Sequence, residues 1–493
     1  MISLSARAFG AVLGLACLVS LASCLSFDTV RCNVDNDCGY NGARCLDHVC
    51  VVDGDAGVQL DAGSDAGSGC ATSADCTDMT KPICGAGMTC RACDITAATS
   101  GVGTVGDGEC ASKGGQVAPH CQATGPLVGQ CTGCRLGMND CAVDQPVCGM
   151  DNVCRGCTSH DECPQSLVCN DDGKCADKTT VAYVDKGCSS SAVHDGGKAT
   201  PYCEIADALV AARPLIHVAG NALAYNSITL PTVGTTRLVA SQTSPKAIIS
   251  SGVMSNPVVN ITLAGAGNPD ITIDGFEITG TASMVNGISC LSATTNVKLT
   301  VKRSYIHDVS GVGVSTSKCD VTLDRNKVVH NGTGGITLDN GKFLITNNFF
   351  VANATGGPAV NLGTLTEAVP GHSFVHNTVA DNARLGGGVP GGVVCPVGMA
   401  YTLVASLLTN NTNSNSVNCT VAASSFVSTN GSDVVYADPA PAPAYDYSLK
   451  TGNAANELCC VDKVAKVDSL AVDYFGAARP KGMSSDIGAH EAE

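Results

Sequence analysis

The feature that most constrains the fold of this chain is a short stretch of sequence that recurs. VTLDRNKVVHNGTGGITL, which begins at Val321, returns 22 residues later as FLITNNFFVANATGGPAV, which begins at Phe343. Apolar residues change between the copies, whereas asparagines and a glycine pair keep their places. The pattern extends in both directions with periods of 22 and then 29 residues, so that one apolar position recurs as Val301, Leu323, Ile345, Phe374 and Leu403.

This repeat predicts a coiled β-sheet. Within each period, short runs of alternating apolar residues are broken by Asn and Gly. Alternation predicts half-buried strands, and Asn and Gly favour turns with left-handed backbone. Repeats of this length without long helices predict a solenoid in which each period is one turn. A leucine-rich solenoid is disfavoured by the leucine spacing, and a helical one by the richness in Gly, Asn and Val.

The repeated asparagines predict two ladders. Equivalent residues of a coiled parallel sheet stack at about 4.8 Å, so stacked amides can satisfy one another. We expect the asparagines to adopt the left-handed corner conformation, in one column of Asn326, Asn348 and Asn377, with Ser304 and Ser406 as weaker members, and another of Asn331, Asn353, Asn382 and Asn411. Alternation places Val351 only partly inside, so Asn353→Leu should destabilise the fold more than Val351→Ala.

Five groups of four cysteines precede the repeat. An acidic residue comes directly before the second cysteine of every group, and residues 41–182 contain no aromatic side chain. A module of about 25 residues built this way cannot offset its chain entropy by burial, so cross-links of roughly 2–4 kcal/mol each must hold it. The groups are Cys32, Cys38, Cys45 and Cys50; Cys70, Cys76, Cys84 and Cys90; Cys93, Cys110, Cys121 and Cys131; Cys134, Cys141, Cys148 and Cys154; and Cys157, Cys163, Cys169 and Cys175.

Disulfides are favoured over zinc for these modules. C-x-x-C junctions also suit zinc. The chain has thirty cysteines, however, and its N-terminus, described next, predicts export; together they indicate an oxidising compartment. Four cysteines allow three connectivities, which the spacing does not distinguish. We expect no metal ion and no cofactor. In the repeat region we expect Cys188 to pair with Cys203, Cys290 with Cys319, and Cys395 with Cys419, while Cys459 and Cys460 stay unassigned.

The N-terminus predicts export and anchoring. Arg7 precedes an apolar run that is short for a membrane span, which is typical of a signal peptide. The run ends in Leu-Ala-Ser-Cys at Cys24, which resembles the bacterial lipobox; the resemblance implies that acyl chains on Cys24 anchor the mature protein. An ordinary signal peptide is the alternative. We therefore expect an outer-membrane lipoprotein that faces the cell surface or the periplasm.

Two family resemblances support this organisation. The cysteine groups resemble the four-cysteine repeats of many surface lipoproteins of Gram-negative bacteria, which implies location more than activity. Residues from about 180 onward resemble the right-handed parallel β-helix of the pectin-lyase-like superfold, with a capping helix in PYCEIADALVAA from Pro201. DYSLKTGNAANE and DYFGAARPKGMSSDIGAHE resemble the C-terminal segment of choice-of-anchor Q proteins, although residues 453–457 depart from the family's S-P-A-I-D.

The predicted fold class is therefore all-β, a right-handed parallel β-helix preceded by small disulfide-rich modules. We expect a signal peptide at 1–23, the lipid anchor and first cysteine module at 24–50, a flexible Asp/Gly/Ala linker at 51–69, and four further modules at 70–175. The β-helix with its N-terminal cap is expected at 183–435 and the choice-of-anchor Q-like cap at 436–493.

Two outward columns contain the candidate catalytic residues. One is expected to hold Arg303, Arg325, Asn347 and His376, and the other Asp308, His330, Ala352 and Asp381. A His or Asp base with an Arg that neutralises a substrate carboxylate is chemically capable. A solvated face of mixed charge is the alternative. No tryptophan is available to stack on a sugar, and the motifs of polygalacturonases and alginate epimerases are absent.

Three functional hypotheses follow. The first is a lipid-anchored, non-catalytic β-helix that binds a glycan or a surface protein. The second is a polysaccharide lyase, hydrolase or epimerase that acts on acidic glycans, and the third is a self-assembling surface coat. Nucleic acid is not expected as a partner, because the net charge is -16 and only 15% of residues are charged.

Overall fold

The computed structural model describes residues 43–46, 49–52 and 70–492, with gaps at 97–104, 115–117, 125, 137–139, 143, 190–192, 212, 255, 264–266, 281, 294–296, 354–355, 364–370, 383–389, 400, 440–444 and 467–468. The chain divides into two compact units, Met1–Gly69 and Cys70–Glu493. In the first unit, β1 (Ala43–Leu46) pairs antiparallel with β2 (Val49–Val52). The predicted signal peptide, the lipidation site Cys24 and residues 53–69 of the predicted linker lie outside the described residues, whereas Val51 and Val52 of that linker belong to β2.

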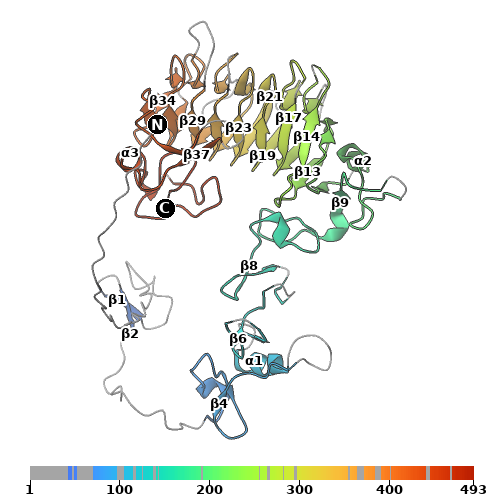
Figure 1. The fold of residues 1–493 in the computed structure, drawn as a ribbon, viewed down its shortest axis with the longest axis vertical. Coiled ribbons are helices and arrows are strands. Elements are labelled where there is room, and N and C mark those ends of the chain that lie inside the picture. The colour runs from blue at the N-terminus through green and yellow to red at the C-terminus, as the bar shows by residue number, and fades with distance from the viewer. Residues whose placement is uncertain are drawn as a thin grey trace, which may run out of the picture. The chain divides into compact units, whose positions relative to one another are not determined.

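Three long parallel sheets form the β-helix of the second unit (Figure 1). Neighbouring strands in each sheet are about three apart in chain order, because every coil gives one strand to each sheet. The first sheet contains β9 (Val181–Val184), β10 (Leu215–Val218), β13 (Thr235–Ala240), β16 (Asp270–Asp274), β19 (Val297–Lys302), β22 (Cys319–Asp324), β25 (Phe343–Thr346), β28 (Ser373–Val375), β31 (Thr402–Val404) and β34 (Thr420–Val421). The predicted all-β fold, a parallel β-helix, is confirmed.

The other two sheets follow the same rule. The second contains β11 (Tyr225–Asn226), β14 (Ile248–Ser251), β17 (Glu277–Gly280), β20 (Tyr305–His307), β23 (Lys327–Val329), β26 (Phe349–Val351), β29 (Thr378–Ala380), β32 (Leu407–Thr409) and β35 (Phe426–Ser428). The third contains β12 (Ile228–Thr229), β15 (Val259–Leu263), β18 (Ile288–Ser292), β21 (Val312–Ser317), β24 (Gly334–Asp339), β27 (Val360–Leu362), β30 (Val393–Val394) and β33 (Ser416–Val417).

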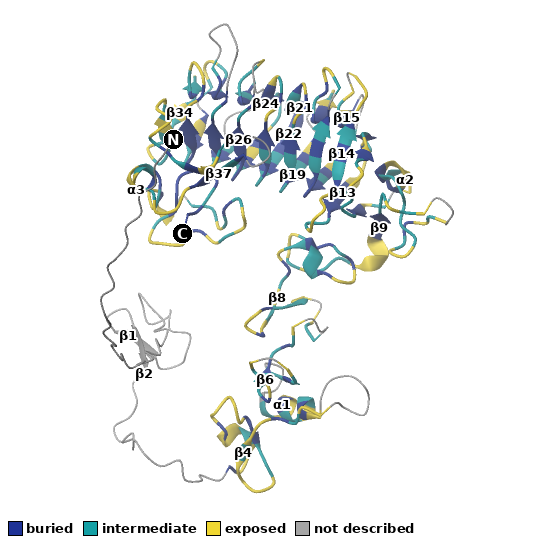
Figure 2. Ribbon diagram, in the orientation of Figure 1, coloured by how far each residue is buried: buried dark blue, intermediate teal, exposed yellow. Residues whose placement is uncertain are grey.

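The core lies between the three sheets. The repeating apolar position stacks as predicted, because the strand register pairs Ile273, Val301, Leu323, Ile345, Phe374 and Leu403 in turn. Figure 2 shows the buried residues concentrated along these strands. The helix α2 (Ile205–Val210) buries Ile205 and Ala208 against the same core, at the place where the sequence predicts a capping helix.

The asparagine ladders are present and buried. The backbone N–H and the Nδ2 of Asn326 both donate to Oδ1 of Asn348, at 2.8 and 3.0 Å. Its Nδ2 also donates to the Val301 carbonyl at 2.8 Å, so one side chain joins three coils. The first column continues through Asn377, Ser406 and Ser425, and the second runs Asn331, Asn353, Asn382, Asn411 and Asn415.

The ladder asparagines do not have left-handed backbone, so that expectation is wrong. The residue before each asparagine of the predicted columns has it instead: φ is 55° at Arg325, 55° at His330 and 51° at Ala352. The left-handed residue turns the chain at the corner, and the asparagine after it places its amide inside, where the neighbouring coils provide partners.

Val351 also differs from expectation, because it is fully buried. It faces away from the β-helix core and belongs to a second apolar cluster, in which the outer face of the second sheet packs against the C-terminal segment through Tyr447, Leu449, Ile487 and Ala489. This segment contains β36 (Tyr436–Asp438), which pairs antiparallel with β37 (Asp446–Leu449), and α3 (Ala454–Cys459). Sequence alternation along one strand does not reveal a covering segment a hundred residues away.

In each module from Cys70 to Cys175 the first cysteine bonds to the third and the second to the fourth. The bonds are Cys70–Cys84, Cys76–Cys90, Cys93–Cys121, Cys110–Cys131, Cys134–Cys148, Cys141–Cys154, Cys157–Cys169 and Cys163–Cys175. The pairs Cys188–Cys203, Cys290–Cys319 and Cys395–Cys419 also form, and Cys459 bonds to Cys460. Of the first module's cysteines, Cys45 and Cys50 lie in β1 and β2, and Cys32 and Cys38 lie outside the described residues.

The modules contain little regular structure. Their elements are β3 (Ile83–Cys84), β4 (Cys90–Arg91), α1 (Gly106–Gly114), β5 (His120–Cys121), β6 (Cys131–Thr132), β7 (Val147–Cys148), β8 (Cys154–Arg155) and short 3-10 turns at Ser73–Asp75 and His160–Glu162; a further 3-10 turn, Lys178–Thr180, lies between the last module and β9. The recurrent acidic residue organises each module: the Glu162 carboxylate accepts from the backbone N–H of Thr158 at 2.7 Å and pairs with Arg155 of the C-x-x-C junction. Despite the opposing effect of burial, these bonds lower the pKa of Glu162 to about 2.

Reduction should unfold the modules and spare most of the β-helix. Residues 70–156 have small apolar clusters made mainly of cystine sulfur, whereas the β-helix has a continuous aliphatic core. Each disulfide contributes roughly 2–4 kcal/mol, which these modules cannot replace. In circular dichroism with and without reductant, we expect the β signal to persist. Its loss together with module order would contradict the independent core.

Candidate functional site

The two predicted outward columns exist, but other parts of the chain cover much of them. Arg303 is the clearest case. Its Nε donates to Oδ1 of Asp274 at 2.8 Å, and its Nη2 contacts Oδ2 of Asp274 and lies 3.0 Å from Nε2 of His160 in the fifth cysteine module. Arg303 therefore binds another part of the protein and is not presented to a substrate.

Three more candidates are used within the chain. His376 is fully buried, and its neighbour in the column, Asn347, is 2% exposed and donates from Nδ2 to the Val472 carbonyl. The Asp381 carboxylate accepts from the Tyr447 hydroxyl at 2.7 Å. Arg325 pairs with Asp324. Asn347 and His376 are thus buried where the sequence predicts exposed side chains, and the Asn347 amide contacts the C-terminal segment.

Asp308 and His330 are the two candidates that the structure brings together at the surface. Their side chains are 49% and 54% exposed, and Oδ1 of Asp308 contacts Nδ1 of His330. Oδ2 of Asp308 lies 2.8 Å from Nδ1 of His307, whose Nε2 lies 3.1 Å from Oε1 of Glu277. We call Glu277, His307, Asp308 and His330 the imidazole–carboxylate cluster.

Two members of this cluster were missed in the sequence. His307 and Glu277 lie on the neighbouring strands β20 and β17, whose register pairs Thr279 with His307. Both side chains alternate outward with core residues, which is the signal that could have found them once the coils were aligned. The repeat is less regular at Glu277, so the sequence alone did not align it with the later coils.

The electrostatics of the cluster fit a charged His307. Burial opposes that charge, but hydrogen bonds to Glu277 and Asp308 outweigh it and raise the pKa of His307. The hydrogen bond from His307 lowers the pKa of Glu277. For Asp308, burial acts against ionisation, yet His330 and His307 together lower its pKa. Hydrogen-bond donors and acceptors therefore alternate from the half-buried carboxylate of Glu277 to the exposed imidazole of His330.

Aromatic and basic groups flank the cluster. The Tyr305 ring stacks on His307 with centroids 4.0 Å apart, and Nζ of Lys327 lies 5.5 Å from the centre of the same ring. Tyr445 stacks on His330 at 6.0 Å. This surface combines hydrogen-bonding groups of both kinds with two tyrosine rings that stack on its imidazoles.

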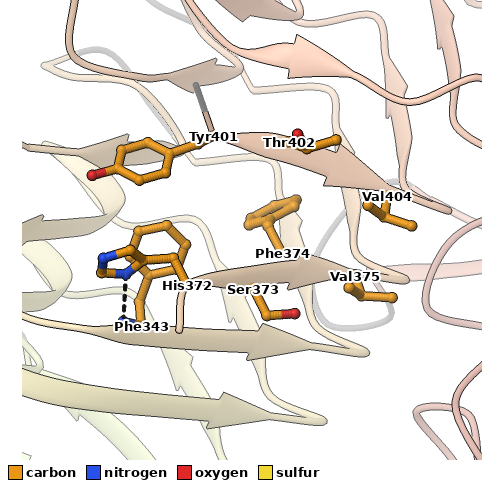
Figure 3. Close-up of a pocket in the computed structure, with 8 residues that line it drawn as sticks. All are labelled: Phe343, His372, Ser373, Phe374, Val375, Tyr401, Thr402 and Val404. Carbon is orange, nitrogen blue, oxygen red and sulfur yellow. Dashed lines mark hydrogen bonds between the residues drawn. The ribbon is translucent and has the colours of Figure 1, made fainter. Parts of the chain in front are cut away.

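A small cavity of about 160 Å³ lies on the first sheet between β28 and β31. Figure 3 shows the rings of Phe343, His372 and Tyr401 at one end and the side chains of Val375 and Val404 at the other. Sites for drug-sized ligands measure about 300–1,000 Å³, so this cavity is too small for a sugar chain. We do not place the candidate site there.

The groups of possible metal ligands among the described residues are made of cysteines that are already in disulfides, one of them beside His194. No helix in the described part of the chain is long and apolar enough to span a bilayer.

Comparison with known proteins adds one structural likeness. No protein-family model matches the chain, and no curated protein matches it. The crystal structure of the pectate lyase Pel9A is similar at 12% sequence identity and a TM-score of 0.37, over 64% of this chain and 96% of the lyase chain. At that level the likeness says nothing about activity.

The cluster should make stability depend on pH in a defined direction. Because the pKa of His307 is raised in the folded protein, the protonated imidazole stabilises the fold. This stabilisation is complete below the ordinary histidine pKa of 6.5 and is lost as pH rises through the raised pKa of the folded protein. The lowered pKa of Glu277, ordinarily 4.5, gives stability that is lost as pH falls. Between pH 4.5 and 6.5 both contributions are present.

We therefore expect stability to fall above pH 6.5, by about 1 kcal/mol or less, as for partly exposed ion pairs. Urea midpoints across pH would measure this loss, and His307→Gln should remove it. An unchanged pH profile in the variant would show that other groups cause the dependence.

Proposed function

We propose that this protein is a lipid-anchored surface protein that displays its β-helix for binding and does not catalyse a reaction. The supporting observation is the use of Arg303, His376 and Asp381 in contacts within the chain. Acid–base chemistry on an acidic glycan needs such groups to face the substrate. The lipid on Cys24, which lies outside the described residues, is part of the proposal.

The imidazole–carboxylate cluster is the proposed binding surface, and a glycan is the proposed ligand. Its two carboxylates accept hydrogen bonds and its exposed imidazole, His330, donates or accepts them, which matches sugar hydroxyls that do both. Exposed Asp308 and His330 are directly available.

A glycan array probed with the intact protein would test this proposal. We expect binding that His330→Ala and Asp308→Asn weaken at least tenfold. Lys298→Ala, at a site on the first sheet away from the cluster, is the matched control and should leave binding unchanged. Binding to no glycan, or equal binding by all variants, would contradict the proposal.

A catalytic role is the second candidate, and one observation favours it. Glu277, His307, Asp308 and His330 form a continuous hydrogen-bonded chain that ends in an exposed imidazole, which is suited to moving a proton. Self-assembly, the third hypothesis, stays a prediction that light scattering of the unlipidated protein can test.

A further inference from the structure

The fifth cysteine module, residues Cys157–Cys175, packs on the outer face of the first sheet. Its Val168 is fully buried in an apolar cluster with four sheet residues, Val181, Tyr183, Leu215 and Val239. The Tyr183 hydroxyl donates to the carbonyl of Ser166 at 3.2 Å. Exposing an apolar seam of this kind to water is unfavourable. The contact therefore resembles the packing inside a domain core and not a transient contact.

A buried charge cluster lies beside this seam. Both His160 of the module and Asp274 of β16 have fully buried side chains, and Nε2 of His160 lies 3.1 Å from Oδ2 of Asp274. Nδ1 of His160 accepts from the Cys169 N–H at 3.0 Å, which leaves Nε2 to carry the proton toward Asp274. Arg303 binds the same carboxylate. Burial disfavours ionised Asp274, but His160 and Arg303 hold its pKa well below the usual range.

A third set of contacts involves the hairpin after Cys169 and Asp161 of the 3-10 turn His160–Glu162. Nη1 of Arg237 donates to Oδ1 of Asn170 at 2.8 Å. Nζ of Lys302 lies 2.5 Å from Oδ1 of Asp171. Ser241 donates to Oδ1 of Asp161 at 3.2 Å. The module therefore places acidic and amide oxygens opposite the basic side chains of β13 and β19.

The other described modules lack these docking residues. Counted from the cysteines, the second module has Ser73 where the fifth has His160, and Gly85 and Ala86 where the fifth has Asn170 and Asp171. The fourth module has Gly149 and Met150 at the hairpin, and Met150 is 92% exposed. The docking chemistry is thus confined to the module nearest the β-helix.

We infer that the fifth module is a permanently docked part of the β-helix domain, so that the row of modules joins the β-helix through a fixed joint. Undocking would expose Val168 and its partners and leave the Asp274 carboxylate without His160. The fixed joint keeps Arg303 from any ligand and holds the imidazole–carboxylate cluster in one orientation relative to the last module.

Disulfide reduction rates in the intact chain test this inference. We expect Cys157–Cys169 and Cys163–Cys175 to be reduced at least tenfold more slowly than Cys134–Cys148 and Cys141–Cys154, as measured by alkylation and mass spectrometry. Docking suppresses the local opening that admits the reductant. Equal rates for the two modules would overturn the inference.

Two variants attribute the protection to docking. His160→Ala should raise the reduction rate of the fifth module to that of the fourth. Ser73→Ala, at the equivalent place in the second module, removes a hydrogen bond from the Cys84 N–H within that module and should leave the reduction rate of the fifth module unchanged. Arg303→Met removes the β-helix side of the same contact and should also raise the reduction rate of the fifth module. Protection that survives in both folded variants would contradict the inference; if neither variant folds, the rates in the unmodified protein decide it.

Discussion

Replacing Asn353 with leucine is expected to lower the free energy of unfolding of the β-helix by roughly 3–5 kcal/mol, because each stranded buried polar group costs about 1–3 kcal/mol. Oδ1 of Asn353 accepts from both the N–H and the Nδ2 of Asn331, and its Nδ2 donates to the Val328 carbonyl and to Oδ1 of Asn382. Leucine provides none of these groups, and the neighbouring coils exclude water.

Two further variants test whether the loss of stability in Asn353→Leu comes from the asparagine ladder. Val351→Ala should cost roughly 2 kcal/mol, because Val351 is fully buried beneath the C-terminal segment and large-to-small core changes have that size. Asn353→Ser should be milder than leucine, since serine already occupies the neighbouring ladder at Ser304 and Ser406. Urea midpoints of the three variants measure this order. A leucine variant as stable as the serine one would mean that the amides contribute little.

Arg479→Ala is expected to release the C-terminal segment, at a cost of roughly 3–5 kcal/mol, the usual effect of breaking a buried ion pair. Nη1 of Arg479 donates to Oε2 of Glu491 at 2.9 Å and to the Asp486 carbonyl, while Nη2 donates to the Gly488 carbonyl at 2.8 Å. Neither side chain of the pair is more than 1% exposed, so alanine leaves the Glu491 charge buried and unpaired.

Tyrosine fluorescence can follow this release, because the chain has no tryptophan and Tyr436, Tyr447 and Tyr474 lie in the segment. The matched control is Lys463→Ala, which removes an exposed cation from the same segment and should change stability by no more than about 0.5 kcal/mol. Equal effects of the two variants would mean that the buried pair does not hold the segment in place.

The repeat was sufficient to predict the β-helix core and the ladders. Hydrophobic period and asparagine spacing are local properties of a chain, and in a solenoid each coil contacts mainly its neighbours. The stacking of Val301 on Leu323 and of Asn326 on Asn348 could therefore be predicted from a shift of 22 residues.

Contacts outside that periodicity could not be predicted. His160 meets Asp274 across 114 residues, and no pattern in a single sequence links a cysteine module to a particular coil. The same holds for Val351 beneath the C-terminal segment and for His376, which the sequence places outside. Module connectivity was also open, since four cysteines admit three pairings. The candidate site was therefore predicted for Asp308 and His330 alone.

The most direct test of the proposed function compares binding with turnover in one experiment. The intact protein is incubated with the glycans that it retains on an array and with polyuronides, and both retention and the release of unsaturated or reducing sugar ends are measured. Non-catalytic display predicts saturable binding, weakened by His330→Ala, and no release of sugar ends above a protein-free control. Release that His330→Ala or Asp308→Asn abolishes would contradict it and identify the imidazole–carboxylate cluster as catalytic.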